Sequence, residues 1–132
     1  MMRIKTLSIP VLDQAKALKF YTEILGLKLK TNIDVGGGNK WLTVESSQEE
    51  NGAEILLEPA PLHFEPSRIY QKAIKDAGLP VAQLEVDDVE KEYERLTDLG
   101  VSFSVKPTSV GTAAIAILDD TCGNFLQLVQ IL

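Results

Sequence analysis

The 132-residue sequence has one cysteine, Cys122, and one histidine, His63. A single cysteine excludes an intrachain disulfide and fits a reducing compartment. A single histidine excludes a metal site built from two histidines of one chain. The chain is long enough for one domain with its own hydrophobic core, so we expect packing rather than cross-links to hold the fold.

Long apolar runs and an excess of basic residues are also missing. No apolar run approaches the roughly 18 residues that a membrane span needs. The opening segment "MMRIKTLSIPV" lacks the apolar core and cleavage site of a signal peptide. The 13 basic residues are outnumbered by 19 acidic ones, giving a net charge of −6. We therefore predict a cytoplasmic protein without a membrane or nucleic-acid partner, and with room for a cationic ligand.

The sequence alternates between strand and helix patterns. Residues 4–11 alternate with Leu7, Ile9 and Val11 on one face, which predicts a strand. Asp13 suits a helix N-cap, and Gly26 suits the helix end. Strands follow in "LKLKTNI", "KWLTVES" and "AEILLEP". From residue 81 the order restarts with "VAQLEV", a helix capped by Asp88, and the strands "VSFSV", "TAAIAIL" and "NFLQLVQI".

The two halves are internally similar. Val11 and Asp13 correspond to Val86 and Asp88 at an offset of 75, whereas "LGLKL" and "LGVSF" lie 74 apart. The second helix is one residue shorter, which accounts for the difference. We predict one domain over residues 1–132, with modules at 1–58 and 81–132. The 59–80 linker would hold a short helix, capped by Ser67 and closed by Gly78.

The V-x-D, F-Y-x-x-x-L-G and D-x-x-G-N elements resemble the vicinal oxygen chelate superfamily. That superfamily includes glyoxalase I, bleomycin and fosfomycin resistance proteins and extradiol dioxygenases. The resemblance covers nearly the whole chain, and "WLTV", "LLEP", "YQKA" and "DDTCGN" are similar to segments of glyoxalase-like bacterial proteins. It implies an α+β fold in which two βαβββ modules form a curled mixed sheet around a cup. It also implies a homodimer.

The same resemblance assigns the faces of the strands. The helix-covered faces would carry Leu7, Ile9, Val11, Ala82, Leu84 and Val86. The cup faces would carry Thr6, Ser8, Trp41, Thr43, Glu54, Leu56, Glu58, Val81, Gln83, Glu85, Phe125 and Gln127.

Metal-dependent relatives place their ligands on the first and last strand of each module. The corresponding positions here are Thr6, Leu56 or Glu58, Val81 and Gln127. Valine and leucine cannot bind a metal, and a glutamine amide is a weak ligand. Catalytic divalent metals require about three imidazole, carboxylate or thiolate ligands. We therefore predict no metal ligand set and no cofactor.

Two functions remain open. The first is a binding protein that holds a small aromatic or cationic molecule with Thr6, Trp41, Glu58 and Gln127. The alternative is a glyoxalase I-like lyase or isomerase, or a dioxygenase-type enzyme, with a divergent metal site. Whether a reaction is catalysed stays open, and Glu58 is the best candidate for a catalytic side chain. His63 and Cys122 are interpreted as solvated or packed residues.

Overall fold

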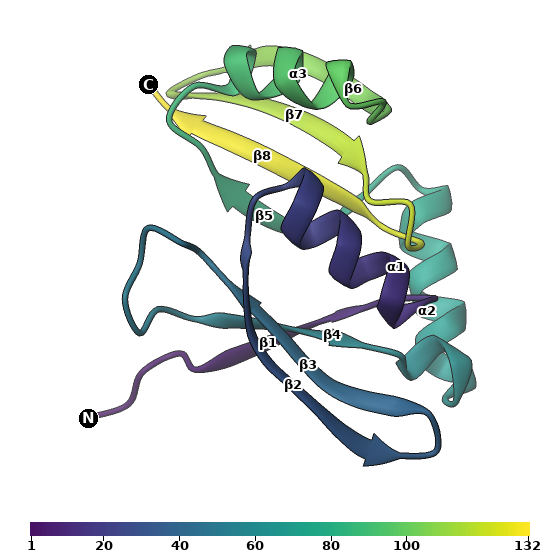
Figure 1. The fold of residues 1–132 in the computed structure, drawn as a ribbon. Helices are drawn as coiled ribbons and strands as arrows, with labels where there is room; N and C mark the ends of the chain where they lie inside the picture. Colours follow the sequence, from purple (N-terminus) through teal and green to yellow (C-terminus); the bar gives the residue numbers. More distant parts are fainter. The chain divides into compact units, whose positions relative to one another are not determined.

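The computed structural model describes residues 1–132. The chain divides into two compact units, residues 1–69 and 70–132. Each unit contains a four-stranded sheet (Figure 1). The boundary falls within helix α2 (Glu65–Asp76), which belongs to both. No helix is long and apolar enough to cross a membrane.

The first unit has a mixed sheet in the order β1-β4-β3-β2. β1 pairs with β4 in parallel, and the other pairs are antiparallel. Its elements are β1 (Thr6–Pro10), α1 (Gln14–Lys19), the π-helical turn η1 (Phe20–Ile24), β2 (Lys28–Gly36), β3 (Asn39–Glu45), β4 (Glu54–Glu58) and the 3-10 turn η2 (Ala60–Leu62).

The second unit repeats this topology in the order β5-β8-β7-β6, again with the first and last strands parallel. Its elements are β5 (Pro80–Glu85), α3 (Val89–Asp98), β6 (Phe103–Val110), β7 (Ala113–Asp119) and β8 (Phe125–Ile131). The predicted α+β class with two βαβββ modules is confirmed.

The two module helices begin in the same way. Asp13 accepts a hydrogen bond from the backbone N–H of Lys16 at 3.0 Å, and Asp88 accepts one from Lys91 at 3.1 Å. Such N-caps satisfy backbone donors that would otherwise lack a partner. The aspartates repeated in the sequence therefore have a shared structural role.

The one-residue difference between the helices is taken up by η1. There the N–H of Leu25 bonds to the carbonyl of Phe20, five residues earlier, at 3.0 Å. A π turn accommodates one extra residue without ending the helix. Both helices are then followed by glycines in the left-handed region, Gly26 at φ +84° and Gly100 at φ +89°.

The core of the first unit lies between α1–η1 and its sheet. α1 contacts β3 and β4. The buried residues include Ile9, Val11, Ala17, Tyr21, Leu42, Val44 and Leu57. The expectation that Leu7 lies beneath the helix is wrong, because this residue is 62% exposed. It lies near the start of edge strand β1, whereas Ile9, two residues further along the same face, is buried.

In the second unit, α3 contacts β6, β7 and β8 (Figure 1). Val89 and Leu96 of the helix are buried. The rings of Tyr93 and Phe103 meet edge to face, with centroids 4.8 Å apart. This arrangement follows from the apolar stripe that the sequence places on the helix.

The linker helix starts earlier than predicted. α2 begins at Glu65, so Ser67 lies within its first turn and is not its N-cap. Pro66 at the second helical position explains the earlier start, because proline fits the first turn of a helix. The C-terminal end agrees with the prediction: Gly78 has φ +75° and bonds to the carbonyl of Lys75 at 2.9 Å.

Candidate functional site

The face of the first sheet opposite α1 carries three of the four predicted ligand-binding residues. Glu58 on β4 pairs with Pro10 on β1, and Trp41 on β3 pairs with Ile33 on β2. The β3–β4 register, in which Thr43 lies opposite Leu56, puts Trp41 and Glu58 at neighbouring positions. These strands therefore form a row with an aromatic ring beside a carboxylate.

This row is open to solvent. Trp41 is 46% exposed and Ile33 is 57% exposed. Glu58 is half-buried and makes no ion pair. An exposed aromatic side chain can stack against a planar ligand and bury apolar surface. An unpaired carboxylate beside it favours a ligand that carries a cationic group.

The opposite end of the same face is charged and more enclosed. Glu54 is only 5% exposed. It accepts hydrogen bonds from Lys5 and from the buried hydroxyl of Thr43, the latter at 2.8 Å. Lys5 and then Thr43 lower the pKa of the Glu54 carboxyl, against the opposing effect of burial. Thr6, the first position of the predicted metal pattern, lies directly opposite Glu54.

Gln127 belongs to the second unit. It lies on β8 opposite Gln83 on β5, and its side-chain amide donates a hydrogen bond to the side-chain oxygen of Gln83. Val81 lies at a register shift in β5, so Gln83 occupies the position facing Gln127. Alternation in the sequence placed both Val81 and Gln83 on this face. The register shift shows that Gln83, and not Val81, is the cross-strand partner of Gln127.

The residues do not fit a catalytic divalent metal. Equivalent positions of the two strand pairs hold Ser8 with Leu56 and Gln83 with Gln127. They offer a hydroxyl, an alkyl chain and two neutral amides, none of which is the imidazole, carboxylate or thiolate that such a metal requires. No three His, Cys, Asp or Glu side chains come together in the structure.

The "DDTCGN" turn is a buried polar network in the second unit. Asp120 accepts backbone N–H groups of Cys122 at 2.7 Å and Asn124 at 3.0 Å, and the Asn124 amide at 2.8 Å. Gln71 of α2 donates to the Cys122 carbonyl at 3.3 Å and to the Asn124 side chain at 3.2 Å. We call these four residues the turn clamp.

The role of the turn clamp is structural. All four of its side chains are at most 3% exposed, and the Cys122 thiol is enclosed within the turn. Gly123 has φ +100°, and a Cβ at this position would lie 2.7 Å from the Gln71 amide. The family-like D-x-x-G-N segment thus shapes the entry to β8 and is not a reactive site. No motif in the sequence pointed to the hydrogen bonds that Gln71 makes with this turn.

His63 lies at the C-terminal end of η2 and is exposed. Its ring Nε2 lies 3.0 Å from the Asn39 side-chain oxygen, which ties the turn to the β2–β3 hairpin. No nucleophile is paired with it, so it has no arrangement suited to catalysis.

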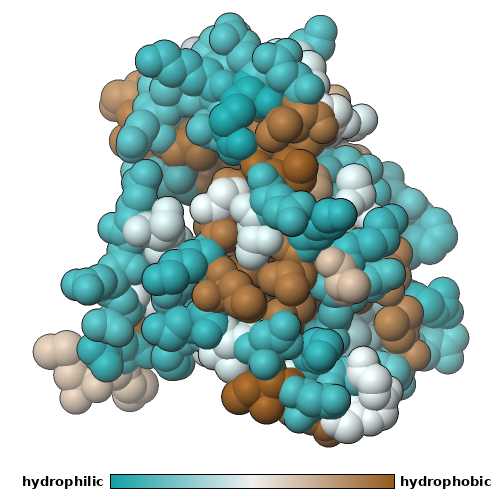
Figure 2. Space-filling model, viewed as in Figure 1, coloured by the Kyte–Doolittle hydropathy of each residue, from teal (hydrophilic) through white to brown (hydrophobic).

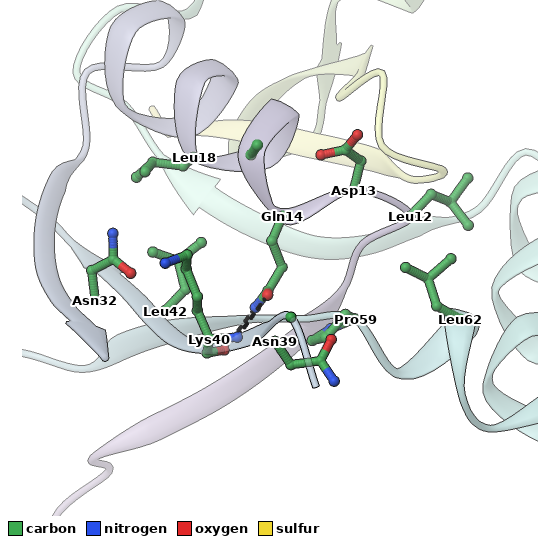
Figure 3. A pocket seen from close by; sticks show the side chains of 12 residues that line it. Leu12, Asp13, Gln14, Leu18, Asn32, Asn39, Lys40, Leu42, Pro59 and Leu62 are labelled. Carbon is green, nitrogen blue, oxygen red and sulfur yellow. Dashed lines mark hydrogen bonds between the residues drawn. The ribbon is translucent and has the colours of Figure 1, made fainter. Parts of the chain in front are cut away.

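A pocket of about 360 Å³ lies on the helix side of the first sheet (Figure 3). Gln14 forms one wall. Its amide donates to the carbonyls of Lys40 at 2.8 Å and Leu57 at 2.9 Å and accepts the Lys40 N–H at 3.0 Å. None of the predicted site residues lines this pocket. The loop before α1 and the β2–β3 hairpin create it, and the sequence pattern did not predict their approach.

Hydrophobic groups are exposed in patches among hydrophilic ones on the molecular surface (Figure 2). Among the exposed hydrophobic residues of the first unit are Ile33, Trp41 and Leu62, each at least 46% exposed. Exposed apolar patches of this kind are common at binding surfaces.

Several known proteins are similar to this chain in sequence or in fold. The protein YurT of Bacillus subtilis (strain 168) is 44% identical over 129 residues, covering 98% of this chain and 99% of YurT. The crystal structure of UcmS2 is 31% identical with a TM-score of 0.82, covering 98% of each chain. TnmS3, an antibiotic binding protein from Streptomyces sp. CB03234, is 24% identical with a TM-score of 0.75, covering 100% of this chain and 98% of TnmS3.

A family model matches residues 3–128. The matched region includes both sheets, both module helices and the turn clamp. The chain belongs to the Glyoxalase/Bleomycin resistance protein/Dioxygenase superfamily.

Proposed function

We propose that this protein binds a small planar molecule bearing a cationic group, on the face of the first sheet that carries Trp41. The observation that carries the proposal is the exposed Trp41 indole beside the unpaired Glu58 carboxylate. The indole offers a stacking surface, and the carboxylate offers a partner for positive charge.

The surroundings support a polar, planar ligand. Ser8 is exposed on the same face, opposite Leu56, and Ile33 extends the apolar surface beyond Trp41. The net charge of −6 also favours a cation. TnmS3, which shares the fold, is an antibiotic binding protein, but at 24% identity the class of ligand for this chain is inferred from its own residues.

Proflavine, a planar aromatic cation, is a suitable probe. Trp41 is the only tryptophan, so its fluorescence reports on this face. We expect saturable quenching by proflavine, and at least tenfold weaker binding to Trp41→Ala when measured by proflavine fluorescence. Glu58→Gln should weaken binding by a smaller factor, because it removes the charge and keeps the shape.

Glu85→Gln is the matched control, because Glu85 is an exposed carboxylate on β5 of the second unit. It should leave proflavine affinity unchanged. Equal affinities for Trp41→Ala and the native chain, or equal losses for Glu58→Gln and Glu85→Gln, would overturn the proposal.

The protein is also proposed to act without a bound transition metal. Elemental analysis of purified protein should find far less than one Zn²⁺, Ni²⁺, Fe²⁺ or Mn²⁺ per chain. We expect no metal-stimulated conversion of the glutathione–methylglyoxal adduct. Close to one metal per chain, lost on Gln127→Ala, would instead favour the lyase or dioxygenase alternative.

Finally, we propose that the chain forms a homodimer. β1 is the edge strand of the first sheet, and its Leu7 side chain is 62% exposed. Such edges usually pair or are covered. Light scattering should give about twice the chain mass of 14.5 kDa. A mass near that of one chain at micromolar concentration would contradict this.

A further inference from the structure

The pocket in Figure 3 lies on the opposite side of the first sheet from Trp41. Leu42 and Lys40 point to the helix side of β3, whereas Trp41 between them points to the other side. A ligand in this pocket would therefore not occupy the surface proposed above. The pocket is a separate candidate site.

Its walls are mainly apolar. Leu12 and Leu62 flank one end, and Leu18 and Leu42 lie toward the other (Figure 3). A second hollow of about 340 Å³ shares the wall residues Ala15 and Leu18 and extends along the helix to Leu29. Apolar wall residues therefore follow one another along this side of the helix, from Ala15 through Leu18 to Leu29.

Polar side chains of β2 and β3 also line the pocket, and one of them is positively charged. They are Asn32 on β2 and Asn39 and Lys40 on β3, and the Lys40 side chain extends beside Gln14 (Figure 3). Lys40 makes no ion pair. Asp34 is its cross-strand neighbour, but the Asp34 carboxylate instead accepts the N–H of Gly36 at 2.9 Å.

The acidic group on the other side is already engaged. Asp13 lines the pocket, and its carboxylate caps α1 by accepting the Lys16 N–H. The wall formed by Gln14 is also fixed, because its amide is bonded to backbone groups of β3 and β4. The available polar groups are thus an ammonium and two amides, which together suit a carboxylate.

We propose that this pocket binds a linear aliphatic carboxylate, with the carboxylate at Lys40 and the alkyl chain along Leu18. The volume of about 360 Å³ lies in the lower part of the range for small-molecule sites, which suits a ligand of modest length. Octanoate is the probe.

The test is an NMR titration of ¹⁵N-labelled protein with octanoate, followed by the same titration of Lys40→Met. Saturable shifts should centre on the amides of Asn32, Asn39 and Lys40. The affinity should fall at least tenfold in Lys40→Met. This variant keeps the fold, because the bonds between residue 40 and Gln14 involve only the backbone of residue 40.

Two controls separate charge recognition from general apolar binding. Lys28→Met removes an exposed lysine that does not line the pocket, and it should bind octanoate like the native chain. Octylammonium has the same alkyl chain with the opposite charge and should bind at least tenfold more weakly. Absence of saturable shifts, shifts centred away from these amides, equal affinity for Lys40→Met, or equal binding of octylammonium would each overturn the proposal.

Discussion

The two units share one topology but differ in the turn that precedes their last strand. In the second unit this turn contains the buried turn clamp, fastened by Gln71 of α2. In the first unit the corresponding segment, residues 48–53, is almost entirely exposed. In the first unit a glutamine links different elements: the Gln14 side chain of α1 donates hydrogen bonds to backbone carbonyls of β3 and β4.

The sheet faces opposite the helices differ too. The first unit exposes Trp41 and Ile33 on that face, whereas in the second unit Ile117 and Val129 are buried and Gln83 and Gln127 bond to each other. The second unit therefore has the more buried polar contacts, whereas the first unit has the more exposed sheet face. The following substitutions test that division.

The largest difference is expected at two equivalent glycines. Gly123→Ala should destabilise the protein by about 3 kcal/mol, because alanine is strained at a positive φ and its Cβ would meet the buried Gln71 amide. Gly52→Ala, at the corresponding turn of the first unit, has no positive φ to strain it. Its Cβ would meet the movable Glu49 carboxylate and the Glu49 Cβ at 3.1 Å, so it should change stability by less than about 1 kcal/mol. Urea unfolding of both variants measures the difference. Similar losses would show that the two turns are not energetically distinct.

The two glutamines provide a second, smaller comparison. Gln71→Met leaves buried acceptors at Cys122 and Asn124 without this donor. It should lower the free energy of unfolding by about 2 kcal/mol. Gln14→Met removes bonds to groups that water can reach more easily and should cost about 1 kcal/mol. Urea unfolding of both variants compares the two losses of stability. A larger loss for Gln14→Met would reverse the comparison.

The smallest effect concerns pH and belongs to the first unit. The pKa of Glu54 is lowered in the folded protein by Lys5 and Thr43. Its stabilising contribution is therefore fully present above the ordinary value of 4.5 and is lost as pH falls through the lowered folded value. The stability gap between the native chain and Glu54→Gln should shrink between pH 6 and pH 3. A gap that stays constant over this range would contradict the assignment.

Much of the fold follows from local sequence patterns. The strands and helices can be located from alternation, from the aspartate N-caps and from the terminal glycines. The change of offset from 75 to 74 residues also predicts the extra residue that η1 accommodates in the first helix. The start of α2 was missed because Ser67 is a good N-cap residue, whereas Pro66 favours a start one turn earlier.

The candidate site was less predictable. Alternation separates Trp41 from Leu42 and Val44, but it does not show that Thr43, on the same face as Trp41, is fully buried. Alternation cannot detect the register shift at Val81 or the approach of Gln14 to Lys40, since both depend on contacts between distant segments. Nor can alternation detect that Leu7 is exposed while Ile9, on the same face of β1, is buried.

The central claim is that Trp41 and Glu58 form a ligand surface, and a crystal structure of the protein with proflavine tests it most directly. We predict that the proflavine ring lies over the Trp41 indole, with centroids within about 4.5–7 Å, and that an amino group of proflavine contacts the Glu58 carboxylate. Proflavine bound only elsewhere, with Trp41 unoccupied, would contradict the account.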